Sequence, residues 1–160
     1  MWLDERLEFA DDEDVAAAAG TALIGDVINM SVVRDIGQGH PIYLAILTGG
    51  TEIITGGTAG TLKFQFVSDA QAAIDVTNPT TASVHLQTQI LVTDDAAANT
   101  DQFNVGGVIY FGAIPAEGMV YEQYLGILAV TATTTTTAGT INAFLTLDPH
   151  GWRSYADNEK

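Results

Sequence analysis

The stretch TLKFQF at residues 61–66 decides the fold class, because its polar and apolar residues alternate. A period of two predicts a β-strand that buries one face and leaves the other in water. The stretches SVHLQTQILV at residues 83–92 and INAFLTLD at residues 141–148 alternate in the same way. Further strands are predicted at residues 22–28, 42–48, 108–111 and 124–133.

Turn signals fall between these runs, among them several glycine pairs and the dipeptide Asn78-Pro79. They divide the chain into seven or eight short strands. Some strands are apolar on both faces, which is typical of the middle of a sandwich or of an interface. We therefore predict an all-β fold, an antiparallel β-sandwich with jelly-roll spacing and extended terminal arms. One helical turn is expected within residues 68–74, capped by Ser68 or Asp69.

The composition limits the class of protein. A chain of 160 residues without cysteine is long enough for one domain with its own core, and it uses no disulfides. Its net charge of −15 excludes binding to nucleic acid and to anionic membranes, because both need clustered Lys and Arg. No apolar run approaches the length of a membrane span, and the acidic N-terminus does not resemble a signal peptide, so an intracellular protein is expected. Since 47% of the residues are hydrophobic, we expect a generous core or apolar surface buried against a partner.

The acidic residues are concentrated at the N-terminus. Seven of the 20 lie within the first 14 positions, between a few apolar side chains. We predict an acidic N-terminal arm over residues 1–20, a β-sandwich domain over residues 21–148 and a C-terminal tail over residues 149–160. Apolar anchors beside dense negative charge suit a basic partner surface, whereas solvated charge and core packing are the simpler interpretations. The candidate partner-contact residues are Trp2, Leu3, Leu7, Phe9, Asp11, Asp12, Glu13, Asp14, Trp152 and Tyr155.

Catalytic and metal-binding patterns do not occur in the sequence. The histidines His40, His85 and His150 lack the spacing of metal ligands, and no GxSxG, Walker or GxGxxG motif is present. His85 falls on the polar face of its predicted strand, where a solvated or interfacial imidazole is expected. The acidic run at residues 11–14 does not follow the calcium-loop pattern. We therefore predict a protein that is not an enzyme and that needs no cofactor or metal.

Short motifs spread along the chain resemble one family. They are WLD at residues 2–4, LEF at 7–9, FQFVSD at 64–69, NPT at 78–80, YL at 124–125, AGT at 138–140 and AFLTLD at 143–148. In this order they are similar to the jelly-roll cement, or decoration, proteins of short-tailed phage capsids, of the kind found on Bordetella phage. The similarity extends over most of the chain. The family has no compact binding motif whose residues could be transferred to this sequence.

The resemblance implies a structural virion protein on the outer capsid surface, assembled in the host cytoplasm. Such a protein bridges neighbouring subunits of the major capsid protein and supports the head against the pressure of its DNA. A homo-dimer or homo-trimer is expected, because strands with two apolar faces occur in a chain without disulfides. Two other classes stay open. A carbohydrate-binding β-sandwich would expose a row of aromatic residues, whereas the predicted wet faces carry Gln, Thr and Lys, and a small hydrolase would need converging acids.

Overall fold

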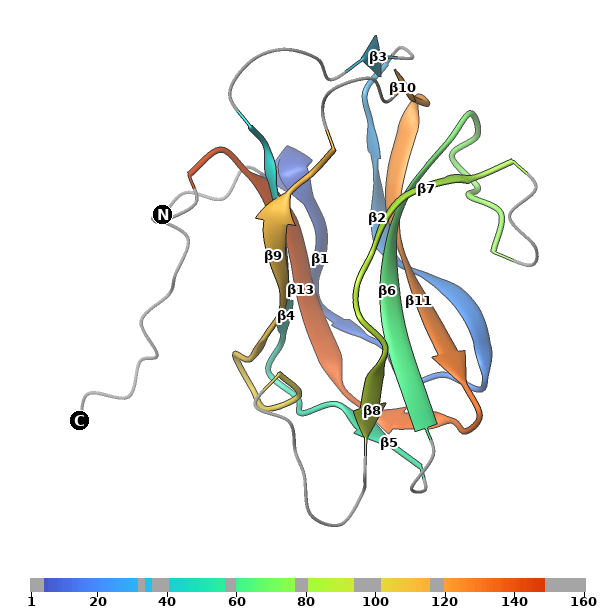
Figure 1. Cartoon of the computed structure of the whole chain (residues 1–160), viewed down its shortest axis with the longest axis vertical. Helices are drawn as coiled ribbons and strands as arrows, with labels where there is room; N and C mark the ends of the chain where they lie inside the picture. The colour runs from blue at the N-terminus through green and yellow to red at the C-terminus, as the bar shows by residue number, and fades with distance from the viewer. Residues whose placement is uncertain are drawn as a thin grey trace.

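The computed structural model describes residues 5–31, 34–35, 41–56, 60–76, 81–93, 102–115 and 120–148 (Figure 1). After one 3-10 turn, η1 (Glu5–Leu7), its regular structure is entirely β. One sheet has the order β1 (Glu8–Asp14), β13 (Thr140–Thr146), β4 (Tyr43–Thr48) and β9 (Val108–Ala113). The other has the order β2 (Gly20–Asn29), β11 (Tyr124–Ala132), β6 (Gly60–Asp69) and β7 (Ser83–Gln87), and β8 (Leu91–Thr93) also pairs with β6. The short pairs β3 (Arg34–Asp35) with β10 (Val120–Tyr121), and β5 (Ile54–Thr55) with β12 (Thr136–Ala138), lie at opposite ends.

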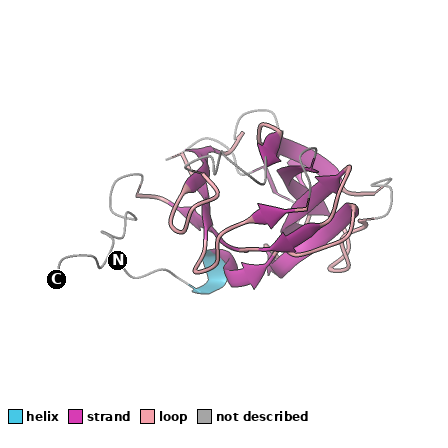
Figure 2. Ribbon diagram, turned by 90° about the horizontal axis from the view of Figure 1, so that it is seen from below, coloured by secondary structure: helices cyan, strands magenta, loops and turns pink. Residues whose placement is uncertain are grey.

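The two large sheets pack face to face as the layers of a sandwich (Figures 1 and 2). Every pairing between the described strands is antiparallel. The predicted all-β antiparallel sandwich is therefore confirmed. Leu62, Phe64 and Phe66 of β6 are fully buried in one core with Leu44 and Ile141 of the opposite sheet. Burying each phenylalanine stabilises the fold by about 1.5–3 kcal/mol, so the alternation at residues 61–66 does determine the inner face.

The first described residues belong to the sandwich and do not form an arm. β1 pairs with β13 at the edge of the four-stranded sheet. Phe9 is 1% exposed and packs edge-on against Phe66, with ring centroids 6.0 Å apart. Val15 is also buried, and its amide donates to the Gly139 carbonyl at 2.9 Å. The prediction of an arm over residues 1–20 is wrong over residues 8–15, because Phe9, Ala10 and Val15 of this segment are buried in the core while the acids at positions 11–14 stay exposed.

One predicted strand is interrupted. Residues 83–92 form two strands, β7 and β8, that pair with β6 on either side of Thr88. The Thr88 amide donates to the Phe64 carbonyl at 2.9 Å, and Thr88 Oγ1 accepts from the Phe64 amide at 3.0 Å. The hydroxyl thus takes the place of a strand carbonyl, and regular pairing resumes only at Leu91.

The helical turn expected within residues 68–74 does not form. Asp69 ends β6, and its side chain organises the following loop instead of capping a helix. Asp69 Oδ1 accepts from the Gln71 amide at 3.1 Å, and Oδ2 accepts from the Asp75 amide at 3.3 Å and the Thr81 hydroxyl at 3.0 Å. A carboxylate that binds its own following backbone favours a turn over a helix.

β1 and β2 close one side of the sandwich. They are edge strands of different sheets, and they lie against each other. At Gly25 of β2, φ is +62°, and a Cβ atom would lie 2.0 Å from the carbonyl oxygen of Phe9. Only glycine meets both conditions, since it has no Cβ and adopts positive φ readily. The missing side chain lets the two edges meet above the core.

Gly25→Ala should lower the free energy of unfolding by more than about 2 kcal/mol, because left-handed backbone alone costs alanine roughly 1–2 kcal/mol and the methyl overlaps a carbonyl. Gly106→Ala is the matched control. Gly106 also has a positive φ, +77°, but a Cβ there would have no neighbour within 4 Å. The control should lose only the part of the unfolding free energy that comes from the left-handed backbone. Urea unfolding measures both variants, and equal losses would contradict the close contact between β1 and β2.

Candidate interaction surfaces

The outer face of the four-stranded sheet is aromatic and uncharged over three strands. β4, β9 and β13 contain no Asp, Glu, Lys or Arg. Apolar residues that point away from the main core form a separate cluster on these strands. We call this surface the aromatic face, and its residues are Tyr43, Ala45, Leu47, Phe111 and Phe144. Ala45 and Phe144 of this face are buried, so its half-buried residues Tyr43, Leu47 and Phe111 are the ones that could contact another molecule.

The rings of the aromatic face come from neighbouring strands. Tyr43 and Phe111 stack with centroids 5.5 Å apart and planes at 8°. The register places Phe111 and Phe144 on either side of Ala45. Phe144 is 4% exposed, whereas Tyr43, Leu47 and Phe111 are half-buried. The expectation that wet faces carry Gln, Thr and Lys does not extend to β4, which is apolar on both sides, whereas the outer side of β13 carries Asn142 and Thr146 beside Phe144.

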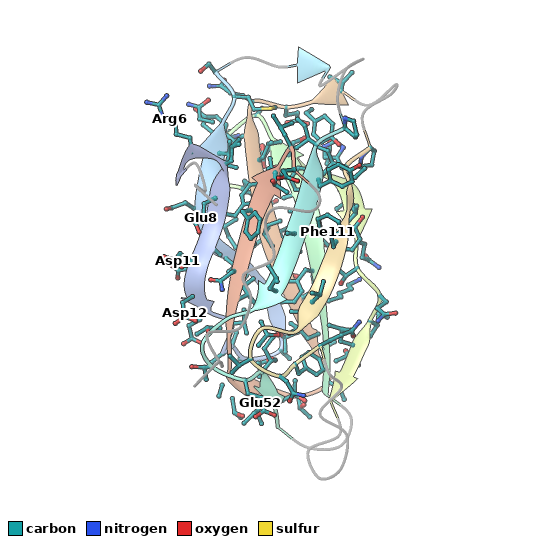
Figure 3. The ribbon with its side chains drawn as sticks, turned by 90° about the vertical axis from the view of Figure 1, so that its left-hand side faces the viewer. Arg6, Glu8, Asp11, Asp12, Glu52 and Phe111 are labelled. Carbon is teal, nitrogen blue, oxygen red and sulfur yellow. The ribbon has the colours of Figure 1, made fainter. Side chains whose placement is uncertain are left out.

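β1 forms an acidic border beside the aromatic face. Its sequence, EFADDED, contributes five carboxylates. Figure 3 looks onto this sheet and shows Glu8, Asp11 and Asp12 along β1, across the sheet from Phe111. The side chains of Asp11 and Glu13 are exposed, and neither carboxylate has a hydrogen-bond or ion-pair partner among the described residues. An apolar centre with a charged border is the usual anatomy of a protein interface.

Asp12 and Asp14 use their carboxylates within the chain. Asp12 Oδ1 accepts from the Gly50 amide at 2.6 Å and from the Thr140 hydroxyl. The Thr140 bond, followed by the Gly50 bond, lowers the pKa of Asp12 below its ordinary value. Asp14 Oδ1 accepts from the Ala16 amide at 2.7 Å. These two acids, predicted as partner contacts, instead hold the irregular edge strand in place.

The other predicted contact residues fall into two groups. Phe9 is a fully buried core residue, so the prediction that it anchors a partner is wrong, and half-buried Leu7 packs against the same core. Both side chains pack against the apolar inner face of the sandwich. The remaining candidates, Trp2, Leu3, Trp152 and Tyr155, lie outside the described residues.

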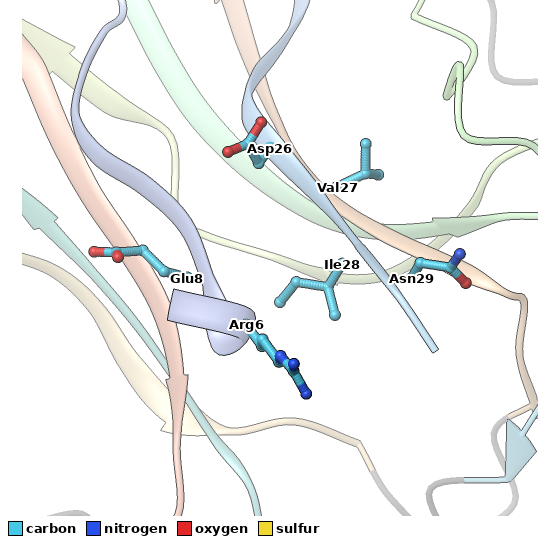
Figure 4. A pocket seen from close by; sticks show the side chains of 6 residues that line it. All are labelled: Arg6, Glu8, Asp26, Val27, Ile28 and Asn29. Carbon is cyan, nitrogen blue, oxygen red and sulfur yellow. The ribbon is translucent and has the colours of Figure 1, made fainter. Parts of the chain in front are cut away.

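A hollow beside the acidic border lies where η1 approaches the end of β2 (Figure 4). Val27 and Ile28 supply its apolar part, and the carboxylates of Glu8 and Asp26 stand around it with Arg6. The full lining is Arg6, Glu8, Asp26, Val27, Ile28 and Asn29. The hollow is open to solvent and mixed in charge, so it widens the border and does not enclose a small ligand.

His85 turns toward β6 and does not lie on the solvated face. Between Phe66 and Val67 the pairing with β7 shifts, and His85 is the extra residue of a β-bulge. Its Nε2 atom lies 2.6 Å from Ser68 Oγ, and its ring lies against Tyr121 with centroids 4.1 Å apart. The expected solvated or interfacial position is therefore wrong, because alternation is broken at the bulge. Ser68 is 0% exposed, so this Ser–His pair offers no nucleophile to a substrate.

Asp12→Asn should lower the melting temperature at neutral pH, because the charged acceptor of the Gly50 amide and Thr140 hydroxyl is lost. The folded-state pKa of Asp12 is depressed, so this stabilisation is present above the ordinary Asp pKa of about 3.9. It is lost as the pH falls through the lower folded-state value. The difference in melting temperature between wild type and Asp12→Asn should therefore become smaller in acid, as thermal melts at several pH values would show. Asp11→Asn, an exposed neighbour, should leave the melting temperature unchanged. A gap that stays constant with pH would contradict the role of the charge.

The described residues contain no helix that is long and apolar enough to cross a membrane. They also contain no group of three or more His, Asp or Glu side chains placed to share a metal ion. No family model and no curated protein matches the chain.

Proposed function

We propose that the chain is a capsid cement, or decoration, protein that binds the outside of a phage head and bridges neighbouring major capsid subunits. The aromatic face, bordered by the acidic strand β1, is the observation that carries the proposal. A β-sandwich presents such a face on a rigid support, as a bridging protein needs. The order of motifs that resembles the cement proteins of short-tailed phages supports the same function. The jelly-roll topology, the virion location and the homo-dimer or homo-trimer belong to this proposal.

The aromatic face would supply most of the binding energy. Fully burying one exposed leucine or phenylalanine contributes about 1.5–3 kcal/mol, and the residues of this face are already half-buried, so each contact is modest. Many copies on a closed shell raise the barrier to rupture, because all of them must be lost together. A protein that acts in this way needs no catalytic centre, cofactor or metal. The terminal segments, with Trp2 and Trp152, stay candidates for additional contacts with the capsid.

The acidic border would set the rate and orientation of binding. Asp11 and Glu13 are exposed and free of partners among the described residues, so they can face basic groups on the shell. Exposed charges of this kind accelerate association at low salt and are screened at high salt.

The first test uses undecorated, expanded heads of the phage that encodes the chain. Leu47→Lys puts a charge into the aromatic face and should weaken binding at least tenfold, about 1.4 kcal/mol. Val120→Lys adds the same charge on β10, at a position that is 63% exposed and outside that face, and should bind normally. Co-sedimentation measures binding, and heat resistance of the decorated heads measures protection. Normal binding by Leu47→Lys would exclude this face, and no binding by wild type would overturn the proposal.

A second test addresses the acidic border. The double variant Asp11→Asn with Glu13→Gln should associate more slowly with the heads at low salt and dissociate at the wild-type rate. The difference should disappear at high salt, where exposed charges are screened. Binding kinetics at two salt concentrations measure both rates. If wild type and variant respond to salt in the same way, these acids do not guide binding.

One observation favours a carbohydrate-binding module as the second candidate. The stacked Tyr43 and Phe111 rings place an aromatic platform on a sheet face, and such platforms can pack against the apolar side of a sugar. A glycan array with wild type and Tyr43→Ala distinguishes the two functions. A specific signal that disappears in Tyr43→Ala would favour glycan binding over capsid binding.

A further inference from the structure

A buried polar group around His85 has no part in the proposed function. Ser68 Oγ accepts a hydrogen bond from the Glu122 amide at 3.1 Å and lies 2.6 Å from His85 Nε2. His85 Nδ1 is buried and has no hydrogen-bond partner. These residues come from β6, from the bulge in β7 and from the position after β10, so they join three segments far apart in sequence.

The contact with Ser68 suits a neutral imidazole. The Ser68 hydroxyl has one hydrogen, and His85 Nε2 is its acceptor among the described residues. Ser68 therefore donates to Nε2, and the imidazole is neutral with its hydrogen on Nδ1. The packing suits a neutral ring, since Phe66 lies on one side at 6.2 Å and Tyr121 at 4.1 Å between centroids.

The charged and titratable groups near His85 do not compensate a positive charge. Glu122, beyond β10, is the nearest acid, and its carboxylate accepts from the Ser83 hydroxyl at 3.2 Å. Burial lowers the pKa of His85, and the attraction of Glu122 opposes this effect without overcoming it. Burial also raises the pKa of Tyr121 to about 12, so that phenol stays neutral. Asp69, at the end of β6, already accepts bonds from its own loop.

Protonation of His85 would break this arrangement. Nε2 would become a donor toward Ser68, and the Ser68 hydrogen would lose its acceptor. The half-buried ring would then carry a positive charge, and its Nδ1–H, which has no partner in the neutral ring either, would not compensate that charge. β7 already deviates from regular pairing at this position, so separating it from β6 requires few regular hydrogen bonds to break.

We propose that His85 is an acid-sensitive latch: as a neutral imidazole it holds β7 and the segment Val120–Glu122 against β6, and as an imidazolium it releases them. The opening is local in its hydrogen bonding, because β4 and β13 belong to the other sheet and pair with neither β7 nor β10. The latch acts in the free protein and does not depend on capsid binding.

The test is the acid response of the full-length chain. The folded-state pKa of His85 is depressed, so stability is complete above the ordinary value of about 6.5 and declines as the pH falls through it. His85→Phe keeps an aromatic ring that cannot be protonated, and it should remove this decline between about pH 7 and pH 5. His40→Gln and His150→Gln are matched controls that should retain it. If His85→Phe loses as much stability as wild type when the pH falls, the latch proposal is overturned.

Hydrogen exchange on the wild-type chain locates the opening. After correction for the intrinsic effect of pH, exchange of the β7 amides should accelerate roughly tenfold per pH unit below the ordinary pKa of histidine. The amides of β4 and β13 should keep their protection. Equal acceleration in all strands would mean global unfolding and would overturn the proposal.

An NMR titration of the three imidazoles keeps the proposal testable if His85→Phe does not fold. The pKa of His85 should lie below the ordinary histidine value of about 6.5, because protonation must break the contact with Ser68. A His85 that titrates at or above that value would contradict the latch.

Discussion

β1 and β2 approach each other closely at Phe9 and Gly25, and this contact closes one side of the sandwich. It joins the edges of two sheets that share no hydrogen-bonded ladder. With the edges together, the Phe9 ring reaches Phe66 and completes the core from the side. The same contact fixes β1 as the outer strand of its sheet, which leaves the acids on the solvent side. Acidic side chains and irregular pairing also protect this edge from joining a strand of another molecule.

The sandwich itself could be predicted from the sequence, because alternation is a local property. Leu62, Phe64 and Phe66 lie in the core as their spacing indicates. The errors occur where a distant contact overrides the local pattern. Thr88 interrupts a strand by binding Phe64, 24 residues away, and neither residue signals this alone. The burial of Phe9 could not be predicted from the sequence around it. The dense acids there indicated a solvated arm, whereas Phe9 is buried because β1 lies against β2 at Gly25.

The candidate surfaces were predicted less well than the fold. The acids of β1 stood out by composition, but sequence could not separate Asp12, whose carboxylate binds Gly50 and Thr140, from exposed Asp11. The aromatic face was missed because Tyr43 and Phe111 are 68 positions apart and meet only through the pairing of β4 with β9. Two apolar faces on one strand were the available signal. That signal indicated burial without distinguishing a second core from an outer surface.

The uneven charge of the four-stranded sheet has a consequence for the molecule as a whole. Five carboxylates lie on β1, and the three strands beside it carry none. Across three strand spacings, about 14 Å, this separation gives the sheet an electric dipole in its own plane. The electric field of a charged surface would therefore exert a torque on the molecule before any atoms touch. It would arrive with one edge leading, and fewer encounters would be lost to wrong orientations.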